Sequence, residues 1–292
     1  MQNVKDCLET PVRFKALDGY ELGGILYGAE SDSGPGRAAL LSCGGGVPAL
    51  RYARFARYLA AEGVPVLTYD YRGIGMSRVG SLRGFNATGE DWSELDSGGA
   101  IEYLRDRFPI ADLVGMAHSI GTLLLGGAPN ATSLSRFVFI SAHTACLGDY
   151  LPRYQIPMAL FWHVCMPIIT SLVGFFPGRA LGIGEDIPKG VALQWGARRT
   201  ARKSSNASPR LAQIFDRAAT LKGPVLVLGT TDDAYATPAA TSRLLRAYAS
   251  LASEVLWYSP DDIGVKRLGH FGIFRRNAER VIWPRIVNFV TR

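Results

Sequence analysis

Short apolar runs that alternate with amphipathic segments are the feature that most constrains the fold of this chain. Residues 38–43, 64–69, 113–117 and 137–141 are runs typical of strands buried on both faces. Helical patterns separate them, most clearly over residues 91–108. Strand, helix and strand at this spacing require parallel crossovers. We therefore predict an α/β protein with a mostly parallel sheet flanked by helices.

Strand signals also open the chain, and the alternation returns near its end. Two alternating runs flank the turn pair Asp18-Gly19, which predicts a hairpin over residues 12–27. After residue 221 the pattern gives strand, helix, strand and helix in turn over 224–228, 238–250, 254–258 and 273–290. The first and last parts of the chain are therefore predicted to build one core.

Between residues 142 and 221 the alternation stops, and a helical segment rich in aromatic and basic residues takes its place. We predict that residues 1–141 and 222–292 form the core and that 142–221 form an inserted helical cap. The apolar stretch 156–177 is long enough for a membrane span, which needs about 20 residues, but prolines and a glycine interrupt it. We interpret it as a cap that lines a substrate pocket. An interfacial lipid contact is less favoured, and a membrane span comes last.

Charge and cysteine content narrow the remaining classes. The net charge of +7 comes largely from basic clusters at 198–210 and 267–280, which carry no nucleic-acid motif and no interleaved aromatic residues. We interpret them as solvated faces rather than a nucleic-acid site. The four cysteines are far apart, without metal-ligand spacing, and the N-terminus lacks the apolar region of a signal peptide. The sequence thus predicts a cytoplasmic protein without a metal or cofactor.

The stretch 115–121, with the sequence GMAHSIG, joins a buried strand to a helix through Ser119. This is the setting of a nucleophile elbow, in which a serine hydroxyl is exposed at the end of a central strand. The sharp turn requires small residues two positions before and after the serine. Ala117 and Gly121 meet this requirement, although the usual pattern has glycine at both positions. We therefore predict that Ser119 is a nucleophile.

A serine hydroxyl needs a base that removes its proton, and the chain has four histidines. His270 lies in a loop between the last strand and the last helix, where a base that reaches back to Ser119 would lie. We predict it as the general base. His118 should point away from the serine, His143 follows a strand end and can approach the site, and His163 lies in the apolar insertion, where a structural role is favoured.

The base in turn needs a carboxylate that holds its tautomer. Asp232 and Asp233 follow the strand 224–228, at the carboxyl end of the sheet, where the sites of α/β proteins form. Either aspartate fits this role, and the chain order becomes serine, aspartate, histidine. A surface turn is the alternative interpretation, because aspartate is common in turns.

Together these motifs resemble the α/β-hydrolase superfamily, and within it the serine aminopeptidase-like and "predicted α/β hydrolase" bacterial proteins. The turn 70–77, with the sequence DYRGIGMS, matches the D-x-R-G-x-G-x-S pattern of that family. The resemblance implies an α/β-hydrolase fold, with a mostly parallel eight-stranded sheet and a helical cap inserted after the sixth strand. The family's spacing from Pro224 selects Asp233 as the acid, while a G-x-x-D pattern from Gly229 would select Asp232.

The resemblance also implies an oxyanion hole made of two backbone N–H groups. One belongs to Ile120, the residue after the nucleophile. The other comes from the loop 42–46, with the sequence SCGGG, in which Gly44 is expected and Gly45 is the second choice. The residues expected to contact the substrate are Gly45, Phe161 and Trp162.

The predicted function is hydrolysis of a carboxylic ester or a related acyl compound through an acyl-Ser119 intermediate. Its partner would be a small, apolar acyl substrate, and a peptidase activity stays open. Two other functions remain in view. One is a non-catalytic protein of the same fold that holds an apolar ligand, and the other is a lipase or acyltransferase that works at a membrane surface.

Overall fold

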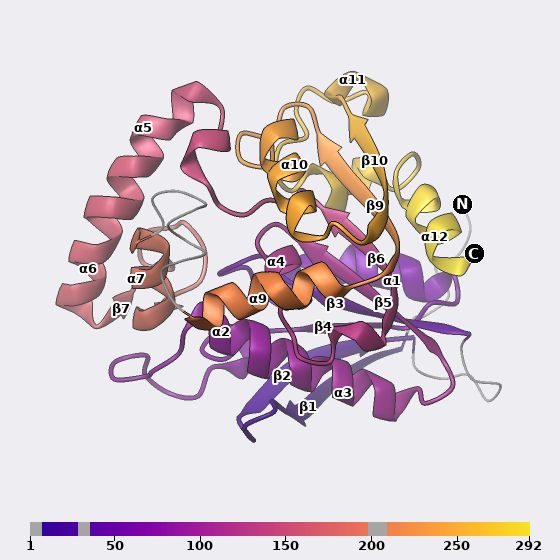
Figure 1. Ribbon diagram of the computed structural model, residues 1–292, viewed down its shortest axis with the longest axis horizontal. Helices are drawn as coiled ribbons and strands as arrows, with labels where there is room; N and C mark the ends of the chain where they lie inside the picture. The colour runs from indigo at the N-terminus through magenta and orange to yellow at the C-terminus, as the bar shows by residue number, and fades with distance from the viewer. Residues whose placement is uncertain (1–7, 29–35, 198–208) are drawn as a thin grey trace.

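An eight-stranded sheet forms the centre of the computed structural model, which describes residues 8–28, 36–197 and 209–292 (Figure 1). The strand order is β1-β2-β4-β3-β5-β6-β9-β10. β2 is antiparallel to both of its neighbours, and the other pairings are parallel. The predicted mostly parallel sheet is therefore confirmed. The strands are β1 (Glu9–Lys15), β2 (Glu21–Tyr27), β3 (Arg37–Ser42), β4 (Val66–Tyr69), β5 (Asp112–His118), β6 (Leu134–Ile140), β9 (Gly223–Thr230) and β10 (Leu251–Tyr258).

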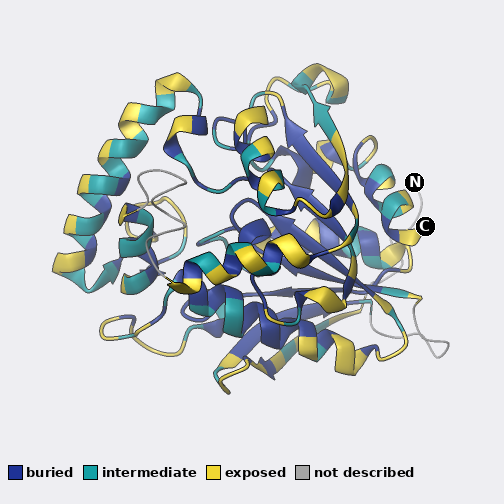
Figure 2. Cartoon of the chain, viewed as in Figure 1, coloured by how far each residue is buried: buried dark blue, intermediate teal, exposed yellow. Residues whose placement is uncertain are grey.

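Helices cover both faces of the sheet, so the central strands lie fully inside (Figure 2). On one face α1 (Ala53–Ala61) packs against α12 (Trp283–Thr291) through the rings of Phe55 and Trp283, whose centroids lie 5.4 Å apart. The remaining core helices are α3 (Gly98–Arg107), α4 (Gly121–Gly126), α9 (Pro209–Thr220) and α10 (Pro238–Ala247). Burial on both faces explains why these strands read as continuous apolar runs rather than alternating ones.

Two predicted helices differ from the observed ones. The helix expected over 91–108 is a short α2 (Gly89–Asp91), a π-helical segment (Trp92–Ser97) and then α3. The helix expected over 273–290 is wrong in its first half, which forms two 3-10 turns, Gly272–Phe274 and Arg276–Ala278. α12 starts only at Trp283, because Pro284 is tolerated in a first helical turn but would break the hydrogen bonds of a helix that began at 273.

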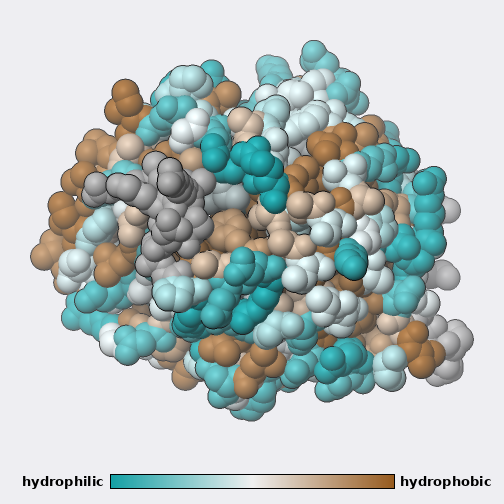
Figure 3. Space-filling model, viewed as in Figure 1, coloured by the Kyte–Doolittle hydropathy of each residue, from teal (hydrophilic) through white to brown (hydrophobic). Residues whose placement is uncertain are grey.

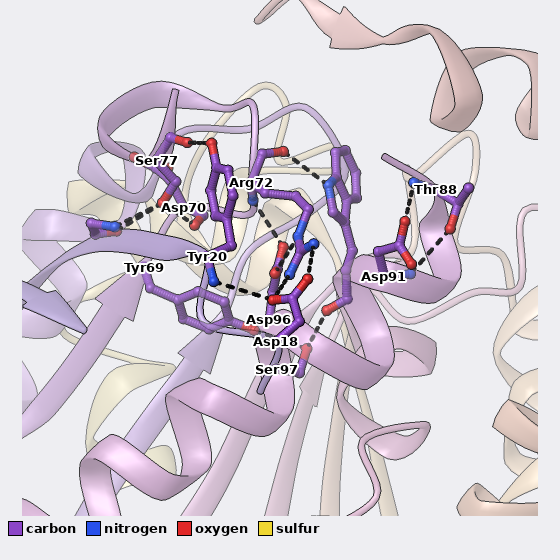
Figure 4. Close-up of polar contacts among 12 residues, drawn as sticks. Asp18, Tyr20, Tyr69, Asp70, Arg72, Ser77, Thr88, Asp91, Asp96 and Ser97 are labelled. Carbon is purple, nitrogen blue, oxygen red and sulfur yellow. Dashed lines mark hydrogen bonds and ion pairs between the residues drawn. The ribbon is translucent and has the colours of Figure 1, made fainter. Parts of the chain in front are cut away.

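The turn after β4 is held by charged groups, of which Asp70, Arg72 and Asp96 are buried and Asp18 is exposed (Figure 4). The guanidinium of Arg72 lies between the carboxylates of Asp96 and Asp18, with N–O distances of 2.7 Å to each. Asp70 accepts a 2.7 Å hydrogen bond from the backbone N–H of Ala49. The turn therefore connects the first hairpin, the helix layer and the loop that follows β3, and that loop borders the site described below.

The insertion after β6 stands beside the sheet as a separate helical layer (Figure 1). It holds one long helix, made of α5 (Pro152–Leu160), a π-helical segment (Phe161–Cys165) and α6 (Met166–Val173). A two-stranded ribbon, β7 (Phe175–Phe176) and β8 (Ile187–Pro188), and α7 (Lys189–Ala197) follow. Residues 198–208, which carry most of the first basic cluster, lie outside the described residues.

The last helix of the predicted cap belongs to the core. In α9, Ile214 packs against Gly127 at the end of α4, so closely that a Cβ on that glycine would lie 2.6 Å from the isoleucine side chain. Arg217 donates a 3.1 Å hydrogen bond to the carbonyl of the same glycine. α9, which lies within the predicted cap 142–221, therefore packs against the end of the core helix α4.

Candidate active site

Ser119 lies in a sharp turn between β5 and α4. Its φ of +58° is in the left-handed region that favours glycine, so the turn is strained. Gly121 allows the turn to approach the end of β3, since a Cβ at this position would lie 2.3 Å from the carbonyl oxygen of Cys43. The strain and the close approach place the serine side chain, which is buried but lines a cavity, beyond the carboxyl end of the sheet.

His270 and Asp233 complete a hydrogen-bonded series with Ser119. The Nε2 atom of His270 lies 2.9 Å from Ser119 Oγ, and its Nδ1 atom lies 2.7 Å from Asp233 Oδ2. An ionised carboxylate only accepts hydrogen bonds, so the imidazole carries its hydrogen on Nδ1. Nε2 is then free to accept the hydroxyl hydrogen of Ser119. The structure thus brings together the three residues that the sequence predicted for the nucleophile, base and acid.

Asp233 is ionised although it is buried. Burial alone would raise its pKa, but the hydrogen bond and the charge of His270, together with two backbone N–H groups, lower that pKa to about 2. Those N–H groups belong to Tyr235 and Ala236 and donate to the second oxygen of the carboxylate. Every oxygen of the group thus has a partner, which holds the carboxylate in place.

Asp232 has a different task. Its two oxygens accept the backbone N–H groups of Leu268 and Gly269 at 2.9 and 2.8 Å. These residues directly precede His270, so Asp232 holds the loop that carries the imidazole. Of the two aspartates that the sequence left open, Asp233 is the one hydrogen-bonded to the ring.

The expected oxyanion role of Gly44 does not fit the structure. Its N–H donates a 2.9 Å hydrogen bond to the hydroxyl of Tyr52, which is fully buried. Within the described residues, the N–H groups of Gly45 and Ile120 have no hydrogen-bond partner, and both residues line the cavity with Ser119. Gly45, the second choice from the sequence, therefore replaces Gly44 as the candidate donor.

His118 connects the loops on the two sides of the site. Its Nε2–H donates to the backbone carbonyl of His270 at 3.1 Å, so its Nδ1 accepts the hydroxyl hydrogen of Tyr52 at 2.9 Å. Burial, with the nearby His270, holds the pKa of His118 well below its usual value, so the ring stays neutral. The resulting series of hydrogen bonds runs from Gly44 through Tyr52 and His118 to the backbone of His270.

The cavity above Ser119 has a volume of about 650 Å³. Its core side is formed by the loops after β3, β5, β6, β9 and β10, and its other side by the insertion. The insertion contributes Met158, Trp162, Ile183 and Trp195, of which only Trp162 was expected from the sequence. A cavity of this size, apolar with a few polar groups at one end, is typical of a site for a small molecule.

Phe161, which the sequence predicted as a substrate contact, is not among the residues that line the cavity. Its ring packs inside the insertion against Phe176, with centroids 5.8 Å apart. Adjacent residues of a helix point in different directions, and here Trp162 faces the cavity while Phe161 faces the ribbon that carries Phe176.

Three further residues that line the cavity had no role predicted from the sequence: His143, Tyr235 and Trp195. For His143, the sequence had indicated that it can approach the site. It follows β6 by three residues, as Asp233 follows β9, and these strands are neighbours whose carboxyl ends meet. No pattern distinguished Trp195 from the other aromatic residues of the insertion.

Neither His163 nor any group of side chains of the metal-ligating types adds a further site within the described residues. The Nδ1–H of His163 donates to the carbonyl of Gly196 at 2.6 Å, within the insertion. In the part of the chain that the structure describes, no group of three or more histidine, cysteine, aspartate or glutamate side chains could hold a metal ion.

Solved structures show the same fold. The chain resembles an esterase of Pyrococcus furiosus with a TM-score of 0.60 and 15% identity over 98% of this chain and 91% of the other. A monoacylglycerol lipase of Paleococcus ferrophilus gives 0.59 and 15% over 92% and 98%. An acylaminoacyl peptidase of Pyrococcus horikoshii gives 0.59 and 16%, where 99% of this chain covers 42% of the other. No curated protein matches the sequence.

A model of the alpha/beta hydrolase family matches residues 39–282. The match includes the turn after β4, the elbow at Ser119, the insertion and both Asp233 and His270. It therefore covers most of the chain, and the eight-stranded sheet agrees with it. The chain belongs to the alpha/beta hydrolase family and is a hydrolytic enzyme.

Proposed function

We propose that the protein is a serine hydrolase that cleaves a carboxylic ester, or a related acyl compound, through an acyl-Ser119 intermediate. One observation carries the proposal. Ser119 Oγ lies 2.9 Å from His270 Nε2, and His270 Nδ1 lies 2.7 Å from an ionised, fully partnered Asp233, at the end of an apolar cavity. This is the arrangement that activates a serine hydroxyl for attack on a carbonyl carbon.

In the first half of the reaction, Ser119 Oγ attacks the acyl carbon while His270 Nε2 takes the hydroxyl proton. The carbonyl oxygen becomes an oxyanion, which the N–H groups of Gly45 and Ile120 would stabilise. Such a donor is worth about 3–4 kcal/mol of the barrier. His270 then gives its proton to the leaving alcohol as the carbonyl re-forms. Asp233 stays ionised and stabilises the imidazolium.

In the second half, a water molecule attacks the acyl carbon, and His270 takes one of its protons. The tetrahedral intermediate collapses, the bond to Ser119 Oγ breaks, and the proton returns from His270 to that oxygen. The products are a carboxylic acid and the free enzyme. The same N–H groups serve the oxyanion in both halves.

The lining of the cavity indicates an apolar acyl group. Met158, Trp162 and Trp195 present apolar surface from the insertion, and no charged side chain of the insertion apart from Glu185 lines the cavity within the described residues. The esterase and the monoacylglycerol lipase among the structural neighbours agree with an ester substrate, while the acylaminoacyl peptidase among them keeps an amide substrate open. The chain would then hydrolyse esters with small or medium apolar acyl chains.

A fluorophosphonate probe tests this proposal, because it reacts only with an activated serine. We expect the wild-type protein to be labelled and to hydrolyse p-nitrophenyl esters, and Ser119→Ala to lose both activities while it keeps the thermal unfolding midpoint. Ser133→Ala, on an exposed turn, is the matched control and should behave as the wild type. Labelling that persists in Ser119→Ala would move the nucleophile elsewhere. A wild-type protein that binds esters but is neither labelled nor active would instead be a ligand-binding protein.

The outer face of the long insertion helix favours a second candidate function, hydrolysis at a lipid surface. Pro152–Val173 is long and apolar enough to cross a membrane by length and composition, with a mean hydropathy of 1.8, yet only 17% of its most apolar window is buried. Figure 3 shows apolar side chains gathered on this outer edge. Five of them, spaced four residues apart and 44–81% exposed, form an apolar ridge: Ile156, Leu160, Val164, Ile168 and Leu172.

The ridge and the residues that line the cavity lie on different sides of the same helix. Met158 and Trp162 face the cavity, while the ridge faces solvent. Residues four apart share one helix face, and such an apolar face is typical of helices that lie in the interface of a membrane. The net charge of +7 would add attraction to anionic lipids. We infer that a lipid surface is where this enzyme would meet an apolar ester.

Vesicles separate this candidate function from the first one. We expect the wild-type protein to sediment with phosphatidylglycerol vesicles more than with phosphatidylcholine vesicles. The double variant Leu160→Glu/Ile168→Glu should lose binding about tenfold or more while it hydrolyses a soluble acetate ester as before. Ile110→Glu, at an even more exposed apolar position on the core, is the control. Equal sedimentation of the two variants would exclude the ridge as a lipid contact.

A further inference from the structure

Two imidazole rings contact the same serine hydroxyl. Besides His270, the Nε2 atom of His143 lies 2.9 Å from Ser119 Oγ. His143 is buried and lies in the loop after β6, and its ring centroid is 5.5 Å from that of His270. The reaction described above uses one base, so the second ring needs a separate explanation.

The hydrogen on each ring follows from the partner of its Nδ1 atom. The backbone N–H of Ala145 donates a 2.9 Å hydrogen bond to His143 Nδ1. An amide nitrogen cannot accept, so Nδ1 of His143 carries a lone pair, and the hydrogen of the neutral ring is on Nε2. The opposite holds for His270, whose Nδ1–H faces a carboxylate. His143 therefore donates to Ser119 Oγ, and His270 accepts from it.

This assignment gives Ser119 Oγ a complete set of contacts. Its single hydrogen points to His270 Nε2, and one of its lone pairs accepts the Nε2–H of His143. His143 cannot act as the base in this arrangement, because the nitrogen that faces the serine already carries a hydrogen.

The backbone around His143 is strained on both sides. Ser141 has a φ of +48° and Ala145 a φ of +57°. With Ser119 at +58°, these are the non-glycine residues with positive φ among those that the structure describes. Such strain persists only where the surroundings enforce it, and it concentrates at functional sites. Here it presents the His143 ring to the nucleophile and the N–H of Ala145 to the ring.

We propose that His143 is a neutral N–H donor to the nucleophile oxygen and that it stabilises the negative charge that develops on Ser119 Oγ. The inference rests on the proposed serine mechanism. As Oγ loses its proton to His270 and attacks, the hydrogen bond from His143 changes from a neutral one to a charge-assisted one and becomes stronger. When the acyl bond to Oγ breaks during deacylation, charge returns to Oγ and the same donor stabilises it. His143 itself neither gains nor loses a proton.

Two substitutions separate the two contacts of the ring. His143→Asn places an amide near the position of Nδ1, so it can still accept from Ala145 but does not reach Ser119. His143→Gln reaches further and can place an N–H group near the position of Nε2. The pair therefore removes or keeps the donor to Oγ while it retains a polar side chain in the buried site.

The rate constant of fluorophosphonate labelling is the decisive measurement, because fluoride leaves without a proton and the rate reports attack by Oγ. We expect His143→Asn to be labelled about 10–100-fold more slowly than wild type, with a similar fall in kcat and a KM within about threefold. His143→Gln should recover at least about tenfold of this loss. The pH–rate profile of His143→Gln should keep the wild-type shape, because His143 neither gains nor loses a proton in the proposed reaction.

Equal losses in the two variants, or a loss in KM rather than kcat, would overturn the inference and reduce His143 to a packing role. So would an unchanged labelling rate in His143→Asn with an unchanged unfolding midpoint. Should His143→Asn fail to fold, a His143→Gln variant labelled clearly more than about 10-fold more slowly than wild type overturns it equally. A wild-type protein that the probe does not label at all would instead refute the serine mechanism, and that outcome differs from every one above.

Discussion

The two sides of the cavity differ in how their residues are held. On the core side, the polar groups around Ser119 bond to one another or to backbone, as Asp233, Asp232 and His118 do. On the side of the insertion, the side chains that line the cavity are apolar apart from Glu185, and the helix that carries Met158 and Trp162 exposes a second apolar face to solvent. The sheet thus fixes the positions of reacting atoms, while the insertion offers a surface with little directional preference.

This difference predicts which kinetic quantity a substitution on each side of the cavity should change. Hydrogen bonds depend steeply on distance and angle, so a substitution on the core side should lower kcat. The strength of apolar contacts depends mainly on the area removed from water, so a substitution on the insertion side of the cavity should change which substrates bind well. The following substitutions test this division between effects on kcat and effects on substrate selectivity, and they are given in order of decreasing effect.

Asp233→Asn should have the largest effect. The amide can hold the ring of His270 in the wrong tautomer, so we expect kcat to fall about 10³–10⁴-fold. The pKa of about 2 keeps the native carboxylate ionised between about pH 5 and pH 8, so we expect no step in the wild-type rate from titration of Asp233 in this range. Steady-state hydrolysis of p-nitrophenyl acetate measures both.

Asp232→Asn is the matched control, one residue away. It loses one acceptor for the backbone N–H groups of the loop before His270 and should cost about tenfold in kcat. A larger loss for Asp232→Asn than for Asp233→Asn would mean that the position of the loop, not the tautomer of the base, limits the reaction.

Trp195→Ala or Trp162→Ala should change selectivity more than rate. Both residues line the cavity, and each buried methylene of a substrate is worth about 0.8 kcal/mol. We expect the ratio of kcat/KM for long and short acyl chains to shift by about tenfold, with little change on an acetate ester. A series of p-nitrophenyl esters of increasing length measures this ratio.

Phe161→Ala controls for stability, because its ring packs within the insertion and not on the cavity. It should lower the unfolding midpoint and leave the chain-length preference unchanged. A uniform loss of kcat/KM on all esters in the tryptophan variants, matched by Phe161→Ala, would show that these variants act through the stability of the insertion and not through contacts with the acyl chain.

Tyr52→Phe should have the smallest effect on the reaction. It removes the hydroxyl that bonds Gly44 and His118, and leaves a buried N–H without a partner, at a cost of about 1–3 kcal/mol. We expect a lower unfolding midpoint and a kcat reduced several-fold, because the loop of Gly45 is less well held. An unchanged kcat in a clearly destabilised variant would show that the loop keeps its place without Tyr52.

The sequence was sufficient for the features that depend on local pattern. Apolar runs indicated the buried strands, and the small residues around Ser119 indicated the elbow. The choice of Asp233 came from family spacing. These features share one property: each is encoded by residues within about ten positions of one another.

Features that depend on distant contacts were not predictable in this way. Whether Gly44 or Gly45 has a free N–H depends on the hydroxyl of Tyr52. Whether Phe161 or Trp162 faces the cavity depends on the phase of a helix whose middle is π-helical, which shifts every residue after it. The role of His143 depends on a hydrogen bond from Ala145 within a strained loop. None of these leaves a repeating signal in the sequence.

The separation of Ser119 from His270 by 151 positions has a consequence for how the protein can be followed as it folds. The two side chains meet only after β9 has joined the sheet beside β6 and the loop before α12 has closed over Ser119. Contacts of such long range form late, because their loop-closure entropy must first be overcome. Recovery of esterase activity after dilution from denaturant would therefore report the last step of assembly, and should lag behind the return of helical circular dichroism.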